Sequence, residues 1–466
     1  MHNVRIDALI DSWKDELIGN LQKWLSVPSV LAESAGEGKP FGEETAKMLE
    51  LALDTARNMG FEAEGFDGYA GHVQMGSGEQ TMGILAHLDV VPTGDGWKHD
   101  PFGGEIEDGK IFGRGACDDK GPALAALYAM RAVREAGVKL KHGVRLILGC
   151  DEETGMLDMR HYAGCCQMPD YGFSPDAEYP VINTEKGGLS ITLNGLGGNE
   201  ESAKIPVYSL YAGERVNVVP GVAWAEVGTE NVSIEEMRQA LLPLDMKITL
   251  SDMGNGRARV EAEGRSAHAS MPHAGVNAAG MLLIALAHLQ AGGNSQAAIA
   301  ALAEKIGLEG DGKSLGIAVD DELCGPLTCN LGLLRYDGLR LTAQLDIRFP
   351  LATSHEKVCG QMALALVDTP LLLKYNGGGK VHHVPAEHPV VQGLLRAYHE
   401  TTGQPAYAFA IGGGTYSRMM PNTVAFGCNF PGDVDCAHMP DEYVELDKYL
   451  LTVKIMARAI EELAGE

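Results

Sequence analysis

Two short segments place acids and an imidazole where an apolar strand gives way to glycine-rich turns: AHLDVVPTGDGW at 86–97 and GRGACDDKG at 113–121. The first continues an apolar run and then breaks at His87 and Asp89, which are two residues apart and therefore share one face of a strand. A helical pattern of apolar residues follows the second segment and stops at Gly137. This order of strand, turn, acid and helix predicts an α/β unit with carboxylates at the carboxyl edge of a sheet, where such sheets bind ligands.

Two later strands are predicted to end in the same way. The apolar run VRLILG at 144–149 is typical of a strand buried on both faces, and three acids, Asp151, Glu152 and Glu153, follow it. A shorter strand at 171–174 leads to Asp176. Helix-length segments separate these strands, which predicts an α/β fold with one mostly parallel sheet.

From about residue 187 the pattern changes to alternating strands with helices at 233–242 and 276–290. This pattern is typical of an α+β domain with antiparallel pairing. Strand-rich stretches on both sides of the second helix hint at two related modules, without a clear repeat. We therefore expect a discontinuous first domain at 1–186 and 381–466, with an inserted domain at 187–380.

Composition and charge argue against nucleic acid and membranes as partners. A chain of 466 residues is too long for one ordinary core, and 63 acidic against 37 basic residues give a formal charge of −26, which disfavours nucleic acid. The nine cysteines are scattered without a CxxC motif, so we expect a reducing, cytoplasmic location and no cysteine zinc site. No secretion signal and no run of 18 apolar residues is present, so no membrane partner is expected either.

Each motif alone has a plainer interpretation. HLD is often a hydrogen-bonded histidine at a strand end, DEE a solvated turn, and GRG a simple turn. The joint pattern differs, because His87, Asp118, Glu153 and Asp176 all follow predicted strands or precede a helix and would gather at one edge. Clustered carboxylates repel one another and need a compensating cation. Imidazole and carboxylate ligands without thiolate suit zinc, manganese or cobalt, and a bridging aspartate suits two ions about 3.5–4 Å apart.

The motifs resemble a known family over essentially the whole chain. AHLDVVP, GRGACDDKGP, CDEETG, SPDAEYP, RVNVVPG, GRSAHASMPHAGVNA, IRFP, IGGGTYSR and CAHMPDE occur in the order typical of the co-catalytic two-metal peptidases and deacylases. This family includes carboxypeptidase G, aminoacylase and succinyl-diaminopimelate desuccinylase. RVNVVPG, IGGGTYSR and the long insert are most similar to the PepV-type dipeptidases.

The resemblance implies a set of metal ligands. Asp118 would bridge two zinc ions, with His87 and Asp176 completing one ion and Glu153 and His438 the other. Manganese or cobalt are possible substitutes.

The resemblance also implies separate roles for the acids that are not metal ligands. Asp89 would fix the tautomer of the His87 imidazole. Glu152 would be the general base that takes a proton from the metal-bridging water and later gives it to the leaving amine. In DDKG the family pattern favours the first aspartate as the ligand, and the plainer interpretation of Asp119 is an N-cap for the following helix.

The insert would act as a lid that supplies substrate contacts. His268 has a plain interpretation as a surface-loop histidine, but with Asn217 it resembles a donor to the tetrahedral oxyanion. Arg348 resembles the arginine that pairs with the C-terminal carboxylate of the substrate. The glycine loop, with Gly413, Gly414 and Thr415, is expected to lie against the substrate, because no dinucleotide fingerprint accompanies it.

Together these features predict a cytoplasmic metal-dependent dipeptidase with a mostly parallel-sheet catalytic domain and an inserted α+β lid domain. It would use two Zn²⁺ per subunit and a zinc-activated water to hydrolyse unblocked dipeptides that carry a free C-terminal carboxylate. The alternatives are an N-acyl amino acid deacylase of the same family, and a catalytically silent binding protein, which the complete ligand set and Glu152 disfavour. Small peptides are the expected partners, and a monomer or weak homo-oligomer is expected because a doubled insert could serve its own active site.

Overall fold

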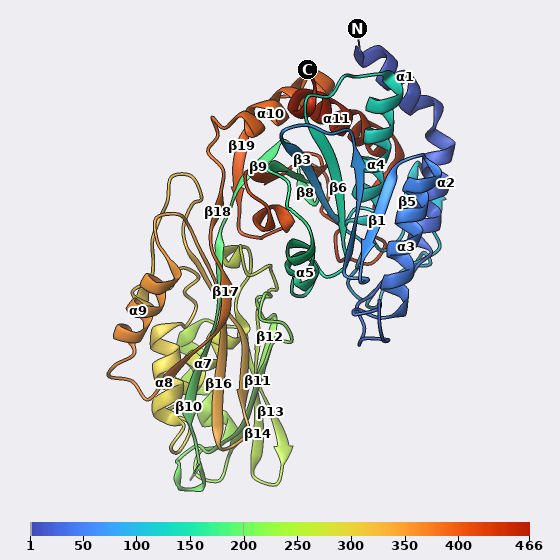
Figure 1. Ribbon diagram of the computed structural model, residues 1–466. Coiled ribbons are helices and arrows are strands. Elements are labelled where there is room, and N and C mark those ends of the chain that lie inside the picture. Colours follow the sequence, from blue (N-terminus) through green and yellow to red (C-terminus); the bar gives the residue numbers. More distant parts are fainter. Residues whose placement is uncertain (1, 199) are drawn as a thin grey trace. The chain divides into compact units, whose positions relative to one another are not determined.

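The computed structural model describes residues 2–198 and 200–466, and the chain separates into two compact units (Figure 1). Unit 1 contains Met1–Thr184, His382–Phe409 and Gly414–Glu466, and unit 2 contains Glu185–Val381 and Ala410–Gly413. The stretch expected as an insert therefore lies in unit 2. The short segment Ala410–Gly413 also belongs to unit 2, which the sequence did not indicate.

The main sheet of unit 1 has nine strands in the order β1-β2-β6-β3-β7-β20-β9-β18, with β19 paired to β9; the last residue of β9 and the last two of β19 are assigned to unit 2. The four central strands β6, β3, β7 and β20 run parallel, whereas β1, β2 and β9 join antiparallel. The predicted α/β class is confirmed, and the parallel part is the centre of a mixed sheet. The strands are β1 Glu62–Phe66, β2 Ala70–Met75, β3 Thr81–His87, β6 Gly143–Gly149, β7 Tyr171–Ser174, β9 Val181–Glu185, β18 His382–His383, β19 Ala408–Ile411 and β20 Thr423–Ala425.

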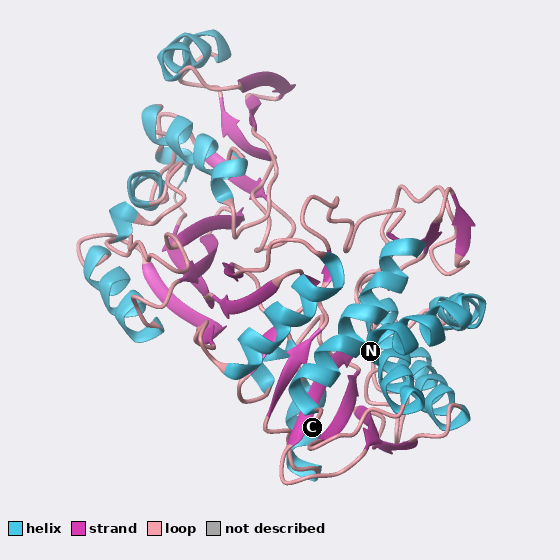
Figure 2. Cartoon of the chain, turned by 90° about the horizontal axis from the view of Figure 1, so that it is seen from above, coloured by secondary structure: helices cyan, strands magenta, loops and turns pink. Residues whose placement is uncertain are grey.

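Helices flank this sheet (Figure 2). They are α1 His2–Ser12, α2 Lys14–Leu25, α3 Glu43–Asn58, α4 Lys120–Ala136, α5 Leu157–Cys165, α10 Pro389–Thr402 and α11 Leu446–Ala464. Two small sheets complete the unit, from β4 Glu105–Glu107, β5 Lys110–Phe112 and β22 Tyr443–Glu445, and from β8 Ala177–Glu178 and β21 Cys428–Asn429. Among the described residues, no helix is both long and apolar enough to cross a membrane.

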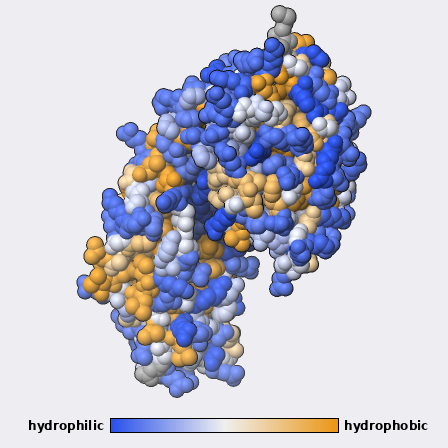
Figure 3. Space-filling model, in the orientation of Figure 1, coloured by the Kyte–Doolittle hydropathy of each residue, from blue (hydrophilic) through white to orange (hydrophobic). Residues whose placement is uncertain are grey.

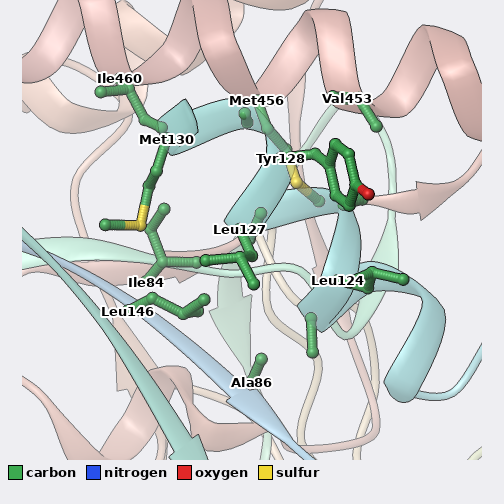
Figure 4. Close-up of a cluster of buried hydrophobic side chains, with 14 of the residues drawn as sticks. Ile84, Ala86, Leu124, Leu127, Tyr128, Met130, Leu146, Val453, Met456 and Ile460 are labelled. Atoms are coloured by element: carbon green, nitrogen blue, oxygen red, sulfur yellow. The ribbon is translucent and has the colours of Figure 1, made fainter. Parts of the chain in front are cut away.

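Helix α4 is the buried helix that fixes the site-bearing loop before it. Its alanine-rich sequence favours a helix, nearly all of its residues are buried, and Gly137 ends it in the left-handed conformation at φ 77°. Figure 4 shows Leu127 and Met130 of α4 packed between Ile84 of the sheet and Met456 of α11. Each fully buried side chain of this size contributes about 1.5–3 kcal/mol, so the start of α4, directly after Asp119, is firmly held.

Unit 2 is an eight-stranded sheet with the order β13-β14-β12-β11-β15-β16-β10-β17, and every neighbouring pair is antiparallel. The predicted α+β class of the insert is confirmed. Strands from both sides of α7 join one continuous sheet, which contains both of the strand-rich stretches seen in the sequence. The elements are β10 Gly187–Leu196, β11 Val207–Ala212, β12 Val222–Gly228, α6 Ile234–Leu241, β13 Ile248–Gly254, β14 Arg257–Glu263, α7 Ala278–His288, α8 Gln296–Lys305, β15 Thr328–Tyr336, β16 Arg340–Phe349, α9 His355–Ala365 and β17 Leu372–Gly379.

The surface agrees with the acid-rich composition. Hydrophilic residues cover most of the face visible in Figure 3. Hydrophobic side chains gather over parts of unit 2, where Leu364, Val367 and Leu372 are exposed.

Candidate functional site

His87 is the last residue of β3, and its imidazole is fully buried at the carboxyl edge of the unit 1 sheet. Its Nε2 lies 3.0 Å from Oδ1 of Asp118 and 3.8 Å from Oδ2 of Asp176, which follows β7. Its Nδ1 lies 3.0 Å from the backbone carbonyl oxygen of Asp89. Burial opposes protonation, but hydrogen bonds with Asp118, Asp176 and Asp89 raise the pKa of His87 well above its ordinary value. The imidazole therefore lies in a strongly negative environment.

A second group lies around the other oxygen of Asp118. Nε2 of His438 is 2.9 Å from Oδ2 of Asp118 and 2.8 Å from Oε1 of Glu153. Burial again opposes protonation, but these two carboxylates raise the pKa of His438 to about 10. Burial alone would raise the pKa of Asp118, yet the two imidazoles hold it well below its ordinary value.

The two groups could each hold a metal ion. Ligand atoms of His87, Asp118 and Asp176 lie within 4.8 Å of one another, as do those of Asp118, Glu153 and His438. Asp118 offers one oxygen to each group, which is the arrangement that a bridging carboxylate needs. Imidazole nitrogens and carboxylate oxygens suit zinc, manganese and cobalt, so the donor set fits a pair of divalent cations.

The turn after β6 carries Glu153 into the second group and leaves Glu152 beside it. Burial and the negative charge of Asp176 raise the pKa of Glu152 well above its ordinary value. The carboxylate of Asp89 accepts the backbone N–H groups of Glu152 and Glu153, each at 3.2 Å. In this structure, Asp89 therefore contacts Nδ1 of His87 through its backbone carbonyl at 3.0 Å and through carboxylate Oδ1 at 3.5 Å, and the same carboxylate holds the glutamate turn.

Asp119 does not have the expected role. It occupies the N-cap position of α4, but its side chain makes no capping hydrogen bond. Instead its Oδ2 accepts the backbone N–H of His87 at 3.0 Å. The N-cap interpretation is wrong because the side chain turns toward the end of β3, where it stabilises the backbone of His87.

A buried ion pair that the sequence analysis did not assign holds the loop of Asp118. Arg114 and Glu442 are 1% and 0% exposed and form a salt bridge. Oε1 of Glu442 also accepts the backbone N–H groups of Gly115 and Cys117 at 3.0 Å and of Asp118 at 3.3 Å. Arg114 lies in the motif GRGACDDKGP and Glu442 in CAHMPDE. The two residues are 328 positions apart in the sequence, and only the fold shows that they are in contact.

A second unassigned pair supports the glutamate turn from its other side. Asp158 accepts the backbone N–H of Cys150 at 2.6 Å and of Asp151 at 2.9 Å, and the hydroxyl of Tyr416 donates to it. Burial raises the pKa of Asp158 to about 6. Tyr416 lies in IGGGTYSR, so this motif also contributes to the support of the turn.

Unit 2 brings together two of the residues expected to bind the substrate. The backbone N–H of Ala269 donates to the carbonyl of Asn217 at 2.9 Å, which joins the Asn217 segment to the His268 segment. Nδ1 of His268 lies 2.7 Å from Oγ of Ser270 and accepts the Ser270 backbone N–H at 3.3 Å. When Nδ1 accepts this hydrogen bond, a neutral imidazole has its proton on Nε2.

Gly412 of the glycine loop connects Arg348 to the His268 segment. Its Nε and Nη2 bind the two carboxylate oxygens of Asp346 at 2.6 and 2.8 Å, and its Nη1 approaches the carbonyl of Gly412 at 3.4 Å. Gly412 lies against Ser270, because a Cβ at this position would be 2.5 Å from the Ser270 Cβ. Unit 2 thus gathers His268, Arg348 and Gly412.

The division between the units falls within the glycine loop. Gly413 belongs to unit 2, whereas Gly414 and Thr415 belong to unit 1. A Cβ at Gly414 would meet the guanidinium of Arg418, and the Thr415 hydroxyl accepts the backbone N–H of Ser417 at 3.1 Å. The candidate metal ligands all lie in unit 1, and Asn217, His268, Arg348 and Gly413 lie in unit 2.

Known proteins resemble this chain over its whole length. The sequence pattern of the family described as "Peptidase family M20/M25/M40" matches residues 83–462. "Putative dipeptidase YtjP" of Bacillus subtilis (strain 168) is 38% identical over 456 residues, which cover 97% of this chain and 98% of the relative. "Beta-Ala-Xaa dipeptidase" of Lactobacillus delbrueckii subsp. lactis is 34% identical over 468 residues, which cover 100% and 99%. The crystal structure of human carnosine dipeptidase 1 shares the fold, with a TM-score of 0.60 at 16% identity and coverage of 99% and 98%.

The family match defines the class of protein as a peptidase that depends on divalent metal ions, and the two candidate ligand groups fit that class. The chain belongs to peptidase family M20/M25/M40, which confirms the resemblance carried by its motifs.

Proposed function

We propose that this metal-dependent dipeptidase hydrolyses unblocked dipeptides with a free C-terminal carboxylate and holds two Zn²⁺ per subunit. The observation that carries the proposal is Asp118, which presents one oxygen to His87 and the other to His438. Relatives described as dipeptidases over nearly their full length support the substrate class.

We assign His87 and Asp176 to one ion, Glu153 and His438 to the other, and Asp118 to both. Bound zinc ions would polarise the scissile carbonyl and lower the pKa of water from 15.7 toward about 7. Mn²⁺ or Co²⁺ would fit the same donors.

Glu152 is the proposed general base. It directly precedes the proposed ligand Glu153 without belonging to either group, and burial together with the charge of Asp176 raises its pKa. It would take a proton from the attacking water and transfer it to the leaving amine. Asp89, whose carboxylate accepts the backbone N–H groups of Glu152 and Glu153, would keep Glu152 in place.

In the same proposal, the catalytic domain comprises 1–186 and 381–466, and the inserted domain 187–380 is a lid that closes over the substrate during the reaction. His268 and Asn217 would donate hydrogen bonds to the tetrahedral oxyanion, which His268 can do with its proton on Nε2.

The substrate's carboxylate would bind Arg348, whose guanidinium is already oriented by Asp346. Gly413, Gly414 and Thr415 would present the backbone that lies along the substrate. We further propose a cytoplasmic monomer or weak homo-oligomer: all nine cysteines, each within the described residues, are free thiols, and each chain carries its own His268.

The test combines metal analysis with a substrate panel. The purified protein should contain two zinc ions per chain and cleave free dipeptides, while N-acetylated and N-succinylated amino acids should be poor substrates. The reverse preference would make it a deacylase and overturn the dipeptidase proposal.

Two variants test the assigned roles. Glu152→Gln should keep both metals and lose nearly all turnover, whereas Asp118→Asn should lose metal affinity because a neutral amide bridges two cations poorly. Glu79→Gln, at an exposed glutamate of the same unit, is the matched control and should behave as wild type. A Glu152→Gln enzyme with turnover within about tenfold of wild type would remove Glu152 from the role of base.

A further inference from the structure

Two free thiols lie side by side behind the proposed metal site. Sγ of Cys117 and Sγ of Cys436 are 3.8 Å apart, although 319 positions separate them in the sequence. Cys117 directly precedes Asp118, and Cys436 lies two residues before His438. The pair therefore connects the two loops that carry ligands of one candidate metal group.

The thiols contribute contacts to the packing of both loops. The Cys117 thiol donates to Oε1 of Glu442 at 3.4 Å, the oxygen that also accepts the Asp118 backbone N–H. The Cys436 thiol donates to the backbone carbonyl of Tyr443 at 3.4 Å. Loss of these two donors would therefore disturb the backbone of both loops.

A small cavity is lined by both cysteines. It has a volume of about 30 Å³ and is lined by Cys117 and Cys436 together with Cys428 and Phe430. A volume above about 10–15 Å³ is enough to hold a water molecule, so an uncharged oxidant of similar size, such as hydrogen peroxide, can be accommodated.

We propose that Cys117 and Cys436 are a modification site, at which hydrogen peroxide forms a disulfide that disrupts the adjacent metal group. A disulfide bond is about 2.05 Å long, so the sulfurs must approach by about 1.8 Å from their present separation of 3.8 Å. Such an approach draws the two loops together and removes the thiol donors to Glu442 and Tyr443. Asp118 and His438 then leave their positions around Glu153.

The chemistry balances with peroxide as the oxidant. One cysteine sulfur attacks a peroxide oxygen, the O–O bond breaks, and a sulfenic acid and one water form. The second sulfur attacks the sulfenic sulfur, the S–S bond forms, the S–O bond breaks, and a second water leaves. Two thiols and one hydrogen peroxide give one disulfide and two waters, and the sulfurs together lose two electrons. A thiol reductant reverses the modification.

The experiment uses the zinc-loaded full-length protein, treated with hydrogen peroxide or with buffer and then freed of excess oxidant. Peptide mapping should show a Cys117–Cys436 cross-linked peptide that is lighter by two hydrogen atoms than its reduced components. A chromogenic chelator should detect release of zinc, and dipeptide turnover should fall by at least about tenfold, the lower end for disturbed support of metal ligands. Dithiothreitol followed by zinc should restore both.

Serine variants test the site with controls. Cys436→Ser and Cys117→Ser, used separately, should each form no cross-link and keep most zinc and turnover after the same treatment. Cys165→Ser, at an exposed cysteine, should respond to peroxide as wild type does. If one of the first two variants fails to fold, the other provides the test.

The possible outcomes test the disulfide proposal separately from the proposed dipeptidase function, on which part of it rests. Absence of the cross-linked peptide would overturn the proposal. A cross-link that forms without zinc release or loss of turnover would overturn the coupling to the metal group. The loss of activity presupposes the proposed dipeptidase function, but mapping of the disulfide does not. An untreated enzyme without dipeptidase activity would refute the function alone.

Discussion

Asp89→Asn distinguishes two ways in which one carboxylate could support the site. The side chain of Asp89 accepts the backbone N–H groups of Glu152 and Glu153 at 3.2 Å each, whereas Nδ1 of His87 bonds the Asp89 backbone carbonyl at 3.0 Å. The substitution leaves that backbone carbonyl in place. It also removes the carboxylate charge 3.5 Å from Nδ1 of His87, so an effect on the glutamate turn has to be separated from an effect on the imidazole.

The magnitude follows from the lost hydrogen bond. Asparagine has one acceptor oxygen, so one of the two backbone N–H groups loses its partner and faces the amide N–H₂ instead. A hydrogen bond to a charged group contributes about 1.5–3 kcal/mol. Since about 1.4 kcal/mol corresponds to a factor of ten, turnover should fall by about 10- to 150-fold if the full loss appears in the transition state. The Michaelis constant should change little.

The assay is steady-state kinetics on a free dipeptide, with zinc content measured for each variant. Asp95→Asn, an exposed aspartate in the same segment, is the matched control and should leave turnover unchanged. A double-mutant cycle with Glu152→Gln gives the mechanism, because a residue that acts by holding Glu152 has little left to lose once the base is removed. In the Glu152→Gln background, Asp89→Asn should therefore cost less than about threefold.

Two results would refute this reasoning. Turnover of Asp89→Asn within about threefold of wild type would show that the two backbone hydrogen bonds do not position the base. A full additional loss in the Glu152→Gln background would show that Asp89 acts through another group, such as His87.

Three further predictions concern other parts of the chain. Arg348→Ala should raise the Michaelis constant for free dipeptides by about 10- to 150-fold, the value of one hydrogen bond to a charged group, and should affect C-terminally amidated dipeptides much less; equal losses on both would refute the carboxylate assignment. His268→Ala should keep its zinc but lose about a hundred- to a thousandfold in turnover, the range for one oxyanion donor; a rise in the Michaelis constant alone would make His268 a ground-state contact. Burial and the charge of Arg145 lower the pKa of His72 from 6.5 to about 4, so the unfolded chain binds this proton first and the free energy of unfolding of unit 1 should fall between pH 6.5 and 4. That loss should total about 2–3 kcal/mol after allowance for partial exposure, and urea titrations of His72→Gln should show a shallower pH dependence than wild type.

The sequence predicted well those elements whose burial produces a local pattern of apolar residues. The apolar run at 144–149 and the shorter strand expected at 171–174 became β6 and β7, which are central parallel strands and are buried on both faces. Strand β1 was missed since its sequence, EAEGF, is largely exposed at a sheet edge and shows no apolar alternation. At the N-terminus the apolar repeat of Ile6, Ile10, Leu17 and Leu21 runs through residue 13 and does not indicate the break at Trp13 that separates α1 from α2.

The same contrast holds for the site. Parallel strands bring their carboxyl ends to one edge, so His87, Glu153 and Asp176 could be placed together from the order of strands and acids alone. The supporting contacts could not, because they depend on which distant segments meet. Nothing near Arg114 in the sequence indicates Glu442, and Asp119 looked like a helix cap until its carboxylate was found on the backbone of His87.

The proposed metal ligands and the proposed substrate-binding residues lie in different units, so experiments can test the two roles separately. All five candidate ligands and Glu152 belong to unit 1, while Asn217, His268 and Arg348 belong to unit 2. Substitutions at the ligands should therefore change metal content, and substitutions in unit 2 should leave it intact and alter only the kinetic constants. Glu152 is the informative exception within unit 1, since removal of this proposed base should abolish turnover while both metals stay bound. A unit 2 variant that lost zinc would mean that the metal centre is not complete within unit 1, and the division of roles proposed here would have to be abandoned.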